Sequence, residues 1–132
     1  MLTVRVQSKG VHVGDADLQA TDPPMGGAGG SFRPLAPYAA IQTVVRELGN
    51  AMKPGSGTAY PAARARFDAL DWALITEDGV VLEGAGGVDL YDFEELGEGS
   101  IELHVAGVSK PEGAYLRYFS NDPAYRAYYE KT

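Results

Sequence analysis

The sequence predicts an α+β protein with an antiparallel sheet of about four to six strands and helices packed on one face. Several stretches alternate apolar and polar residues, which is the period-2 pattern of a half-buried strand. Other stretches repeat apolar residues at spacings of three and four, which is typical of amphipathic helices. The strand-like stretches of the second half are joined by short turns, so we expect their sheet to be antiparallel.

The first two strands are expected at residues 2–7 and 11–20. Residues 2–7, LTVRVQ, alternate apolar and polar side chains at every position. Residues 11–20, VHVGDADLQA, alternate less cleanly because Gly14 interrupts the pattern. The second segment is therefore expected to be a strand or an irregular extended stretch.

A glycine- and proline-rich stretch, TDPPMGGAGGSF, follows at residues 21–32 and is expected to be a loop. It is not a P-loop, because no lysine follows its last glycine to reach a terminal phosphate. It also lacks the last glycine of a dinucleotide fingerprint, whose place Phe32 occupies. A structural loop is one interpretation, and a loop that contacts a pocket or a partner through Met25 and Phe32 is the other.

Two helices are expected in the middle of the chain. Residues 37–48 place a proline near the first turn and a stripe of apolar residues along one side, and a glycine and an asparagine follow. Residues 51–61, AMKPGSGTAYP, form a linker with two prolines and two glycines. Thr58 is the candidate N-cap of a shorter helix whose apolar side extends to Leu70.

The period of the pattern then changes to that of strands. Residues 72–76, WALIT, and 80–82, VVL, flank an Asp78-Gly79 pair, which suits the tight turn of a β-hairpin. Two further alternating stretches predict strands at residues 87–93 and 100–108.

The last eighteen residues contain six of the thirteen aromatic residues and are expected to be helical. They form two clusters at helical spacing: Tyr115, Tyr118 and Phe119, then Tyr125, Tyr128 and Tyr129. Asp122-Pro123 between the clusters is a helix-start signal. Packing of these rings against the sheet is one interpretation. A protein interface is the other, because tyrosine is enriched in interface hot spots.

Length and composition favour a single domain covering residues 1–132. The chain has no cysteine, which excludes disulfides, thiolate nucleophiles and cysteine-bound metals. It also has no apolar run of 18 residues and no basic-then-apolar leader at its start. We therefore expect a cytoplasmic protein that does not enter a membrane.

Negative charge is concentrated in the second half of the chain. The formal net charge is −7, and residues 67–109 contain eleven acids and no lysine or arginine. Such a segment repels a phosphate backbone, which argues against direct nucleic-acid binding, and it complements a basic protein partner. The docking interpretation requires that this charge gathers on one outward face after folding.

No catalytic arrangement emerges from the sequence, which favours a protein that is not an enzyme. The two histidines, His12 and His104, are far apart and match no metal-ligand spacing. The stretch DLYDFEELGEGS departs from the calcium-loop pattern, so no metal site and no cofactor are predicted. Whether the two histidines meet in space is left open.

Three functional hypotheses follow. The first is a small acidic protein, such as an immunity or inhibitor protein, that docks a basic toxin or nuclease. The second is a small enzyme or ligand-binding domain with a site near the glycine-rich loop and the two histidines. The third is an assembly subunit that forms a homo-oligomer. The first is preferred for its charge, and its partner-binding residues would be Asp78, Glu83, Asp89, Asp92, Glu94, Glu95, Glu98, Tyr125, Tyr128 and Tyr129.

Overall fold

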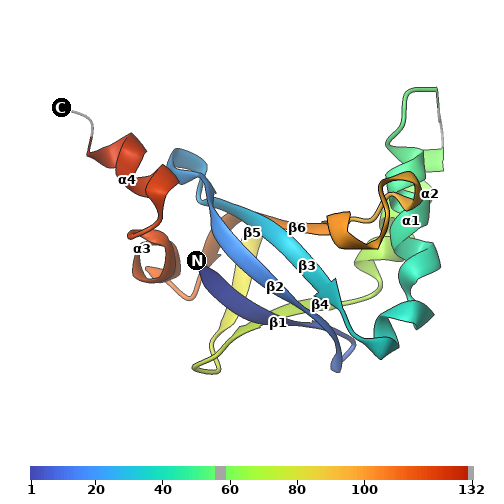
Figure 1. Ribbon diagram of the computed structural model, residues 1–132, viewed down its shortest axis with the longest axis horizontal. Helices are drawn as coiled ribbons and strands as arrows, with labels where there is room; N and C mark the ends of the chain where they lie inside the picture. The colour runs from blue at the N-terminus through green and yellow to red at the C-terminus, as the bar shows by residue number, and fades with distance from the viewer. Residues whose placement is uncertain (56–58, 131–132) are drawn as a thin grey trace.

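Six antiparallel strands close into a barrel in the order β1-β2-β3-β6-β5-β4 (Figure 1). The structure is a computed structural model that describes residues 1–55 and 59–130. The strands are β1 (Leu2–Ser8), β2 (Val11–Asp22), β3 (Gly27–Pro34), β4 (Trp72–Thr76), β5 (Val81–Tyr91) and β6 (Glu102–Lys110). The predicted combination of helices with an antiparallel sheet is thereby confirmed.

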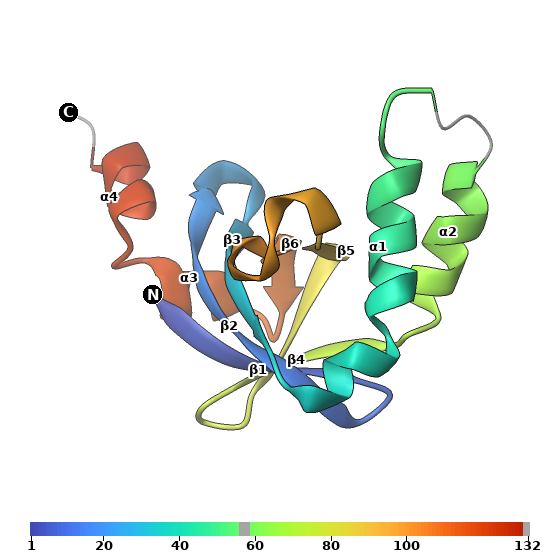
Figure 2. The same ribbon diagram turned by 45° about the vertical axis from the view of Figure 1, so that its right-hand side comes forward.

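Short helices stand at two separate sides of the barrel rather than on one face (Figure 1). The α-helices are α1 (Gln42–Ala51), α2 (Ala59–Asp68), α3 (Ala114–Phe119) and α4 (Pro123–Tyr129). The helices α1 and α2 lie side by side, and α1 contacts β5 (Figure 2). In contrast, α3 contacts β6 and α4 contacts β2. The prediction of helices on one face is corrected accordingly, because a closed barrel offers its outer surface in every direction.

Four 3-10 turns complete the described chain: η1 (Pro23–Met25), η2 (Ala36–Ala40), η3 (Glu94–Leu96) and η4 (Glu98–Ser100). In the described residues no helix exceeds ten residues, and none has the length and hydropathy needed to cross a bilayer. The predicted capping residue Thr58 lies outside the described residues.

The core fills the barrel and continues beneath the helices. Strand residues that point inward include Val4, Val6, Leu18, Leu74, Leu90, Leu103 and Val105, all fully or almost fully buried. Helical side chains extend this cluster, with Val45 and Leu48 from α1, Phe67 from α2 and Phe119 from α3. Both helical sides are therefore held by burial of apolar surface, the dominant stabilising contribution in folding.

The glycine-rich stretch is a strand rather than a loop beyond residue 26, which corrects the prediction for residues 21–32. Only a short turn separates β2 from β3, and it ends at Gly26 with a φ of 73°. A Cβ atom on Gly30 would collide with the carbonyl oxygen of Asp17, and one on Gly14 would collide with the ring of Phe32. These glycines are used because β2 and β3 approach each other closely at these points.

The strand β5 joins two segments that the sequence separates. The sequence predicts two separate strands at residues 80–82 and 87–93. In the structure β5 continues through this run, with register irregularities between Glu83 and Gly87. The predicted Asp-Gly turn is confirmed: Gly79 has a φ of 85°, and its N–H donates to the Thr76 carbonyl at 2.9 Å.

Candidate functional site

The outer face of β3, β6 and β5 carries a row of chemically interesting residues. Along β6, Leu103 and Val105 are buried, so the side chain between them, His104, points outward. The strand register pairs His104 with Gly29 on β3 and with Asp89 on β5. These three positions therefore form one row across the outside of the barrel.

A pocket of about 650 Å³ lies over this outer face. Its floor is made of small residues from three neighbouring strands: Gly27, Ala28, Ala85, Gly86, Ala106 and Gly107. The hollow exists because these positions carry no large side chain. Larger or polar side chains surround the floor: Thr21, Asp22, Met25, Asp89, Tyr91 and His104.

The imidazole ring of His104 packs directly against Gly29. A Cβ atom on Gly29 would lie 2.5 Å from Nδ1 of His104, closer than such atoms approach. The ring of Tyr91 lies on its other side, with centroids 5.3 Å apart and planes at 60°. Phe93 stacks on Tyr91 in turn, with centroids 6.3 Å apart. His104 and Tyr91 thus form an aromatic wall at one end of the pocket.

Burial raises the pKa of the Tyr91 hydroxyl, and the negative charge of Asp89 raises it further. The hydroxyl therefore stays protonated at neutral pH and is available as a hydrogen-bond donor.

Helix α2 neutralises the carboxylate at this end of the pocket. Arg64 forms an ion pair with Asp89 and a second one with Asp68, the latter at 3.2 Å. Its guanidinium also lies 5.4 Å from the centroid of the Phe67 ring. Asp89 is consequently compensated from within the protein, and its orientation is fixed by a neighbouring helix.

The opposite end of the pocket carries Asp22, Thr21 and Met25. Asp22 precedes η1, yet its side chain makes no capping hydrogen bond. Within the described part of the chain it also forms no ion pair. Met25 is 70% exposed at the rim. This end therefore presents one carboxylate that the described residues leave uncompensated.

Helix α3 is joined to the start of β3 by a hydrogen bond beside this end of the pocket. The hydroxyl of Tyr115 donates to the Gly27 carbonyl oxygen at 2.8 Å. Burial raises the pKa of Tyr115 to about 12, with further contributions from the charges of Asp122 and Asp22. The tyrosine remains a neutral donor, and it holds the first residue of β3 in place.

The two histidines do not meet. His12 forms a pair with Asp15 on its own strand, with 2.8 Å between Nε2 and Oδ1. His104 lies two strands away from Gln19, since Gln19 pairs with Gly29 and Gly29 with His104. His12 is seven residues from Gln19 along β2, roughly 23 Å at about 3.3 Å per residue. Only His104 belongs to the pocket, and the described residues contain no cluster suited to a metal ion.

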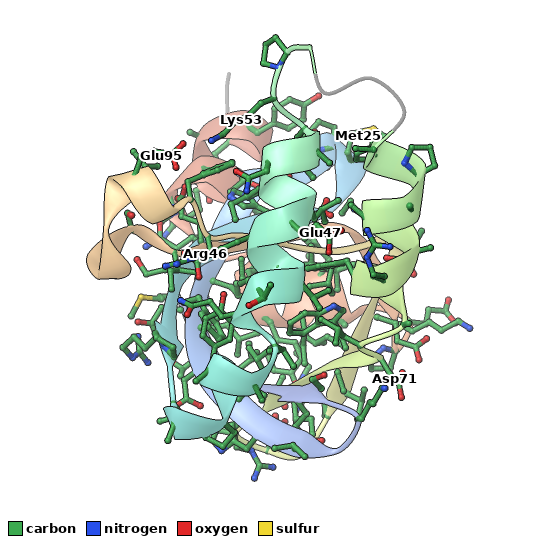
Figure 3. The ribbon with its side chains drawn as sticks, turned by 90° about the vertical axis from the view of Figure 1, so that its right-hand side faces the viewer. Met25, Arg46, Glu47, Lys53, Asp71 and Glu95 are labelled. Atoms are coloured by element: carbon green, nitrogen blue, oxygen red, sulfur yellow. The ribbon has the colours of Figure 1, made fainter. Side chains whose placement is uncertain are left out.

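The acidic segment does not form an uncompensated face. Of its eleven carboxylates, nine have described side chains, because those of Glu94 and Glu98 lie outside the described part. Six of these nine form ion pairs: Asp68 and Asp89 with Arg64, Asp78 with Arg117, Glu83 with Lys110, Asp92 with Arg46, and Glu95 with Lys53. Figure 3 shows that Asp71 and Glu95 lie on opposite edges of the same view. The expectation that this charge gathers on one outward face is therefore not met.

Several of these carboxylates already have polar partners in the protein. The Thr76 hydroxyl lowers the pKa of the Asp78 carboxyl, and Tyr118 and Arg117 contribute to the same effect. The Lys53 ammonium, which extends toward Glu95 in Figure 3, lowers the pKa of that carboxyl. These acids are ionised at neutral pH, but their charge is partly balanced.

Two residues predicted to contact a partner are buried. Asp92 is 1% exposed and accepts hydrogen bonds from Tyr38 Oη at 2.7 Å and Gln42 Nε2 at 3.2 Å. Arg46 Nε lies 3.4 Å from its other oxygen. Phe32 is 3% exposed and packs edge-on against Tyr38. Both therefore join the barrel to η2 and α1 rather than facing a partner.

The predicted tyrosine face is partly available. Tyr125 is half-buried against the core cluster, while Tyr128 and Tyr129 are 47% and 53% exposed. The rings form a chain of contacts, with centroids 4.6 Å apart for Tyr125 and Tyr129 and 4.9 Å apart for Tyr128 and Tyr129. The core-packing interpretation therefore fits Tyr125, and the exposed rings of Tyr128 and Tyr129 are compatible with an interface.

Sequence reasoning placed Met25 and His104 near a possible site but missed the floor between them. The missing residues are Ala85, Gly86, Ala106 and Gly107 on β5 and β6. The available signal was the presence of small residues in both strands, in the runs GAGG and AG. A comparison of the chain with protein family models, curated proteins and solved structures found no match.

Proposed function

We propose that this protein is a ligand-binding domain that takes a small, largely apolar organic molecule into the pocket on the outer face of β3, β6 and β5. The observation that carries the proposal is the pocket itself. Its volume of about 650 Å³ lies within the range of small-molecule sites, roughly 300–1,000 Å³. Its apolar floor and the few polar groups at its two ends are also typical of such sites.

Binding is favoured over catalysis because the polar groups are not coupled to one another. A general base acts on a nucleophile within hydrogen-bond reach. Among the described residues, His104 makes no side-chain hydrogen bond, and Asp89 is engaged by Arg64. The lining includes one hydroxyl of an aliphatic side chain, Thr21, which lies at the end of the pocket away from the aromatic wall.

The expected affinity for a simple probe is modest. Removing roughly 200 Å² of apolar ligand surface from water contributes about 5 kcal/mol at 25 cal/mol per Å². Association costs offset much of this, about 4 kcal/mol or more. The difference is about 1 kcal/mol, which corresponds to a Kd of roughly 0.2 M. Millimolar binding of an indole-sized probe therefore requires about 3 kcal/mol more from the hydrogen bonds and ring contacts at the two ends of the pocket.

Calorimetric titration with tryptophol, a neutral indole alcohol, tests the proposal. Ala106→Leu extends a side chain from the floor into the pocket and should abolish the binding heat. Ala62→Leu adds the same side chain at an exposed position of α2 outside the pocket lining, so its titration should match the unsubstituted protein. Equal binding by all three proteins, or no binding by the unsubstituted protein, would refute the proposal.

Docking of a basic protein is the second candidate function. It includes the immunity and inhibitor class, and it is favoured by the exposed rings of Tyr128 and Tyr129 on a chain of net charge −7. The ion pairs within the acidic segment weaken it. Binding to a basic partner should then weaken steeply with salt and with Tyr129→Ala. A mass measurement on the same sample would reveal a homo-oligomer, the third alternative.

A further inference from the structure

We propose that the ligand of this pocket is an organic amine whose cationic group sits at Asp22 and whose flat apolar body lies on the small-residue floor. The inference rests on the proposed function and names the chemical class of its ligand. It follows from three features of the pocket: its charges, the shape of its floor and the position of its polar groups.

The charges of the lining favour a cation. The described lining residues include two carboxylates, Asp22 and Asp89, and no lysine or arginine. Arg64 compensates Asp89 from outside the lining, whereas Asp22 has neither a capping hydrogen bond nor an ion pair within the described chain. An anionic ligand would face both carboxylates without a basic side chain to hold it. A cationic ligand could pair with the exposed carboxylate of Asp22 without displacing a group of the protein.

The floor favours a flat apolar body. It consists of glycine and alanine, so a planar group can lie directly on the strands. The rings of His104 and Tyr91 stand at one end, where they can contact an aromatic edge or face.

The polar groups at the other end suit an ammonium. If Gly27 carried a Cβ atom, that atom would lie 3.2 Å from the Asp22 Cβ and 3.3 Å from the Thr21 Oγ1, so both side chains flank the edge of the floor. An ammonium has three N–H donors. The carboxylate of Asp22 and the hydroxyl of Thr21 are acceptors that a single ammonium group can engage together.

Three matched indole probes test this inference by calorimetry at one pH and one salt concentration. Tryptamine is cationic, tryptophol is neutral and indolepropionate is anionic, and all three share the same ring. Tryptamine is expected to bind about fivefold more tightly than tryptophol, because a partly exposed ion pair contributes up to about 1 kcal/mol. Indolepropionate is expected to bind most weakly.

The substitution Asp22→Asn should bring the affinity for tryptamine down to the affinity for tryptophol, with both probes measured on the same variant. Asp71→Asn is the matched control, because it changes the net charge equally at an exposed position outside the pocket. Asp71 has a φ of 54°, which asparagine also adopts readily. Tryptamine should therefore keep its advantage in this control.

The outcomes separate the inference from the proposed function. Tryptophol binding that equals tryptamine binding would overturn the amine inference and leave the pocket as a neutral-ligand site. Tightest binding of indolepropionate would overturn the inference too. No binding of any probe would overturn both, whereas loss of the tryptamine advantage only in Asp22→Asn would support both.

Discussion

Two carboxylates, one just beyond the end of β5 and one at the end of β2, have opposite surroundings. At the junction with η2 and α1, Asp92 is buried and is held by Tyr38, Gln42 and Arg46. On the outer wall, the pocket ends at Asp22, which the described residues leave without a hydrogen-bonding or charged partner. The sequence groups Asp89 and Asp92 in one acidic segment, although their surroundings differ.

The difference teaches how to distinguish structural from functional acids. A buried carboxylate whose lone pairs are satisfied by the protein stabilises one arrangement of elements and offers nothing to a ligand. A carboxylate beside an apolar pocket, with no partner among the described residues, can bind an external group without first breaking an internal bond. The number of acids in a segment says nothing about this distinction.

The largest expected loss of stability is at Asp92, where the end of β5 meets η2 and α1. Asp92→Ala removes the acceptor of the buried Tyr38 hydroxyl and the partner of Arg46, and breaking such a buried set costs about 3–5 kcal/mol. Urea denaturation would measure this loss in the free energy of unfolding. Glu102→Ala, at an exposed position of β6, should change it by less than about 0.5 kcal/mol. Similar values for the two variants would contradict the structural role of Asp92.

The next largest effect is a loss of stability where His104 packs against Gly29. Gly29→Ala places a Cβ atom where the imidazole lies, so the ring must move, at a cost of about 1–3 kcal/mol. The same variant should weaken tryptophol binding, because it disturbs the aromatic wall. Gly99→Ala is the control, since a Cβ there meets no atom of the described residues within 4 Å. Unchanged stability and binding in Gly29→Ala would show that the position of the His104 ring does not depend on a glycine at residue 29.

A pH dependence follows from Tyr115. Its pKa is about 12 in the folded protein, against an ordinary value of 10.0. Below pH 10 the hydroxyl is protonated in both states; above it, the unfolded state loses the proton first, so stability falls as pH rises from 10 to 12.

Tyr115→Phe should make this alkaline decline shallower, while the part due to the raised pKa values of Tyr38 and Tyr91 remains. It should also cost about 1 kcal/mol at neutral pH, through loss of the hydrogen bond to Gly27. Denaturation series at several pH values would measure both effects. An alkaline decline of equal steepness in the variant would show that Tyr115 is not its source.

The smallest expected effect is a change in tryptamine affinity when Asp89 loses its basic partner. Arg64→Gln leaves Asp89 uncompensated and should cost about 1 kcal/mol of stability, because the side chains of both residues are only about a quarter exposed. Both ends of the pocket would then carry a carboxylate without a basic partner. Tryptamine should therefore bind more tightly than it does to the unsubstituted protein. Calorimetry would detect the change, and weaker tryptamine binding would show that Arg64 has another role in the pocket.

The sequence predicts elements well where side chains alternate. The strands at residues 2–7 and 100–108 are found as β1 and β6, because their apolar side chains face one side of the sheet. The strand β3 was missed, because glycine gives no alternation signal and its use depends on contacts with β2. Closure of the barrel depends on the pairing of β1 with β4, which local patterns do not specify.

The site was predictable only in part. The second hypothesis named the glycine-rich stretch and His104, and both lie at the pocket. The compensation of Asp89 by Arg64 and of Asp92 by Arg46 joins residues 25 and 46 positions apart, so a charge count along the chain cannot reveal it. The burial of Phe32 was missed for a related reason, because its neighbours resemble loop residues.

Amide chemical shifts recorded during a tryptophol titration test the central claim most directly. We predict that the shifts concentrate at Gly27, Gly29, His104 and Ala106 on the outer wall, while Gln42 and Arg46 at the Asp92 junction stay unchanged. Shifts confined to the junction or to the tyrosines of α4, or their absence across the protein, would contradict a ligand site on this wall.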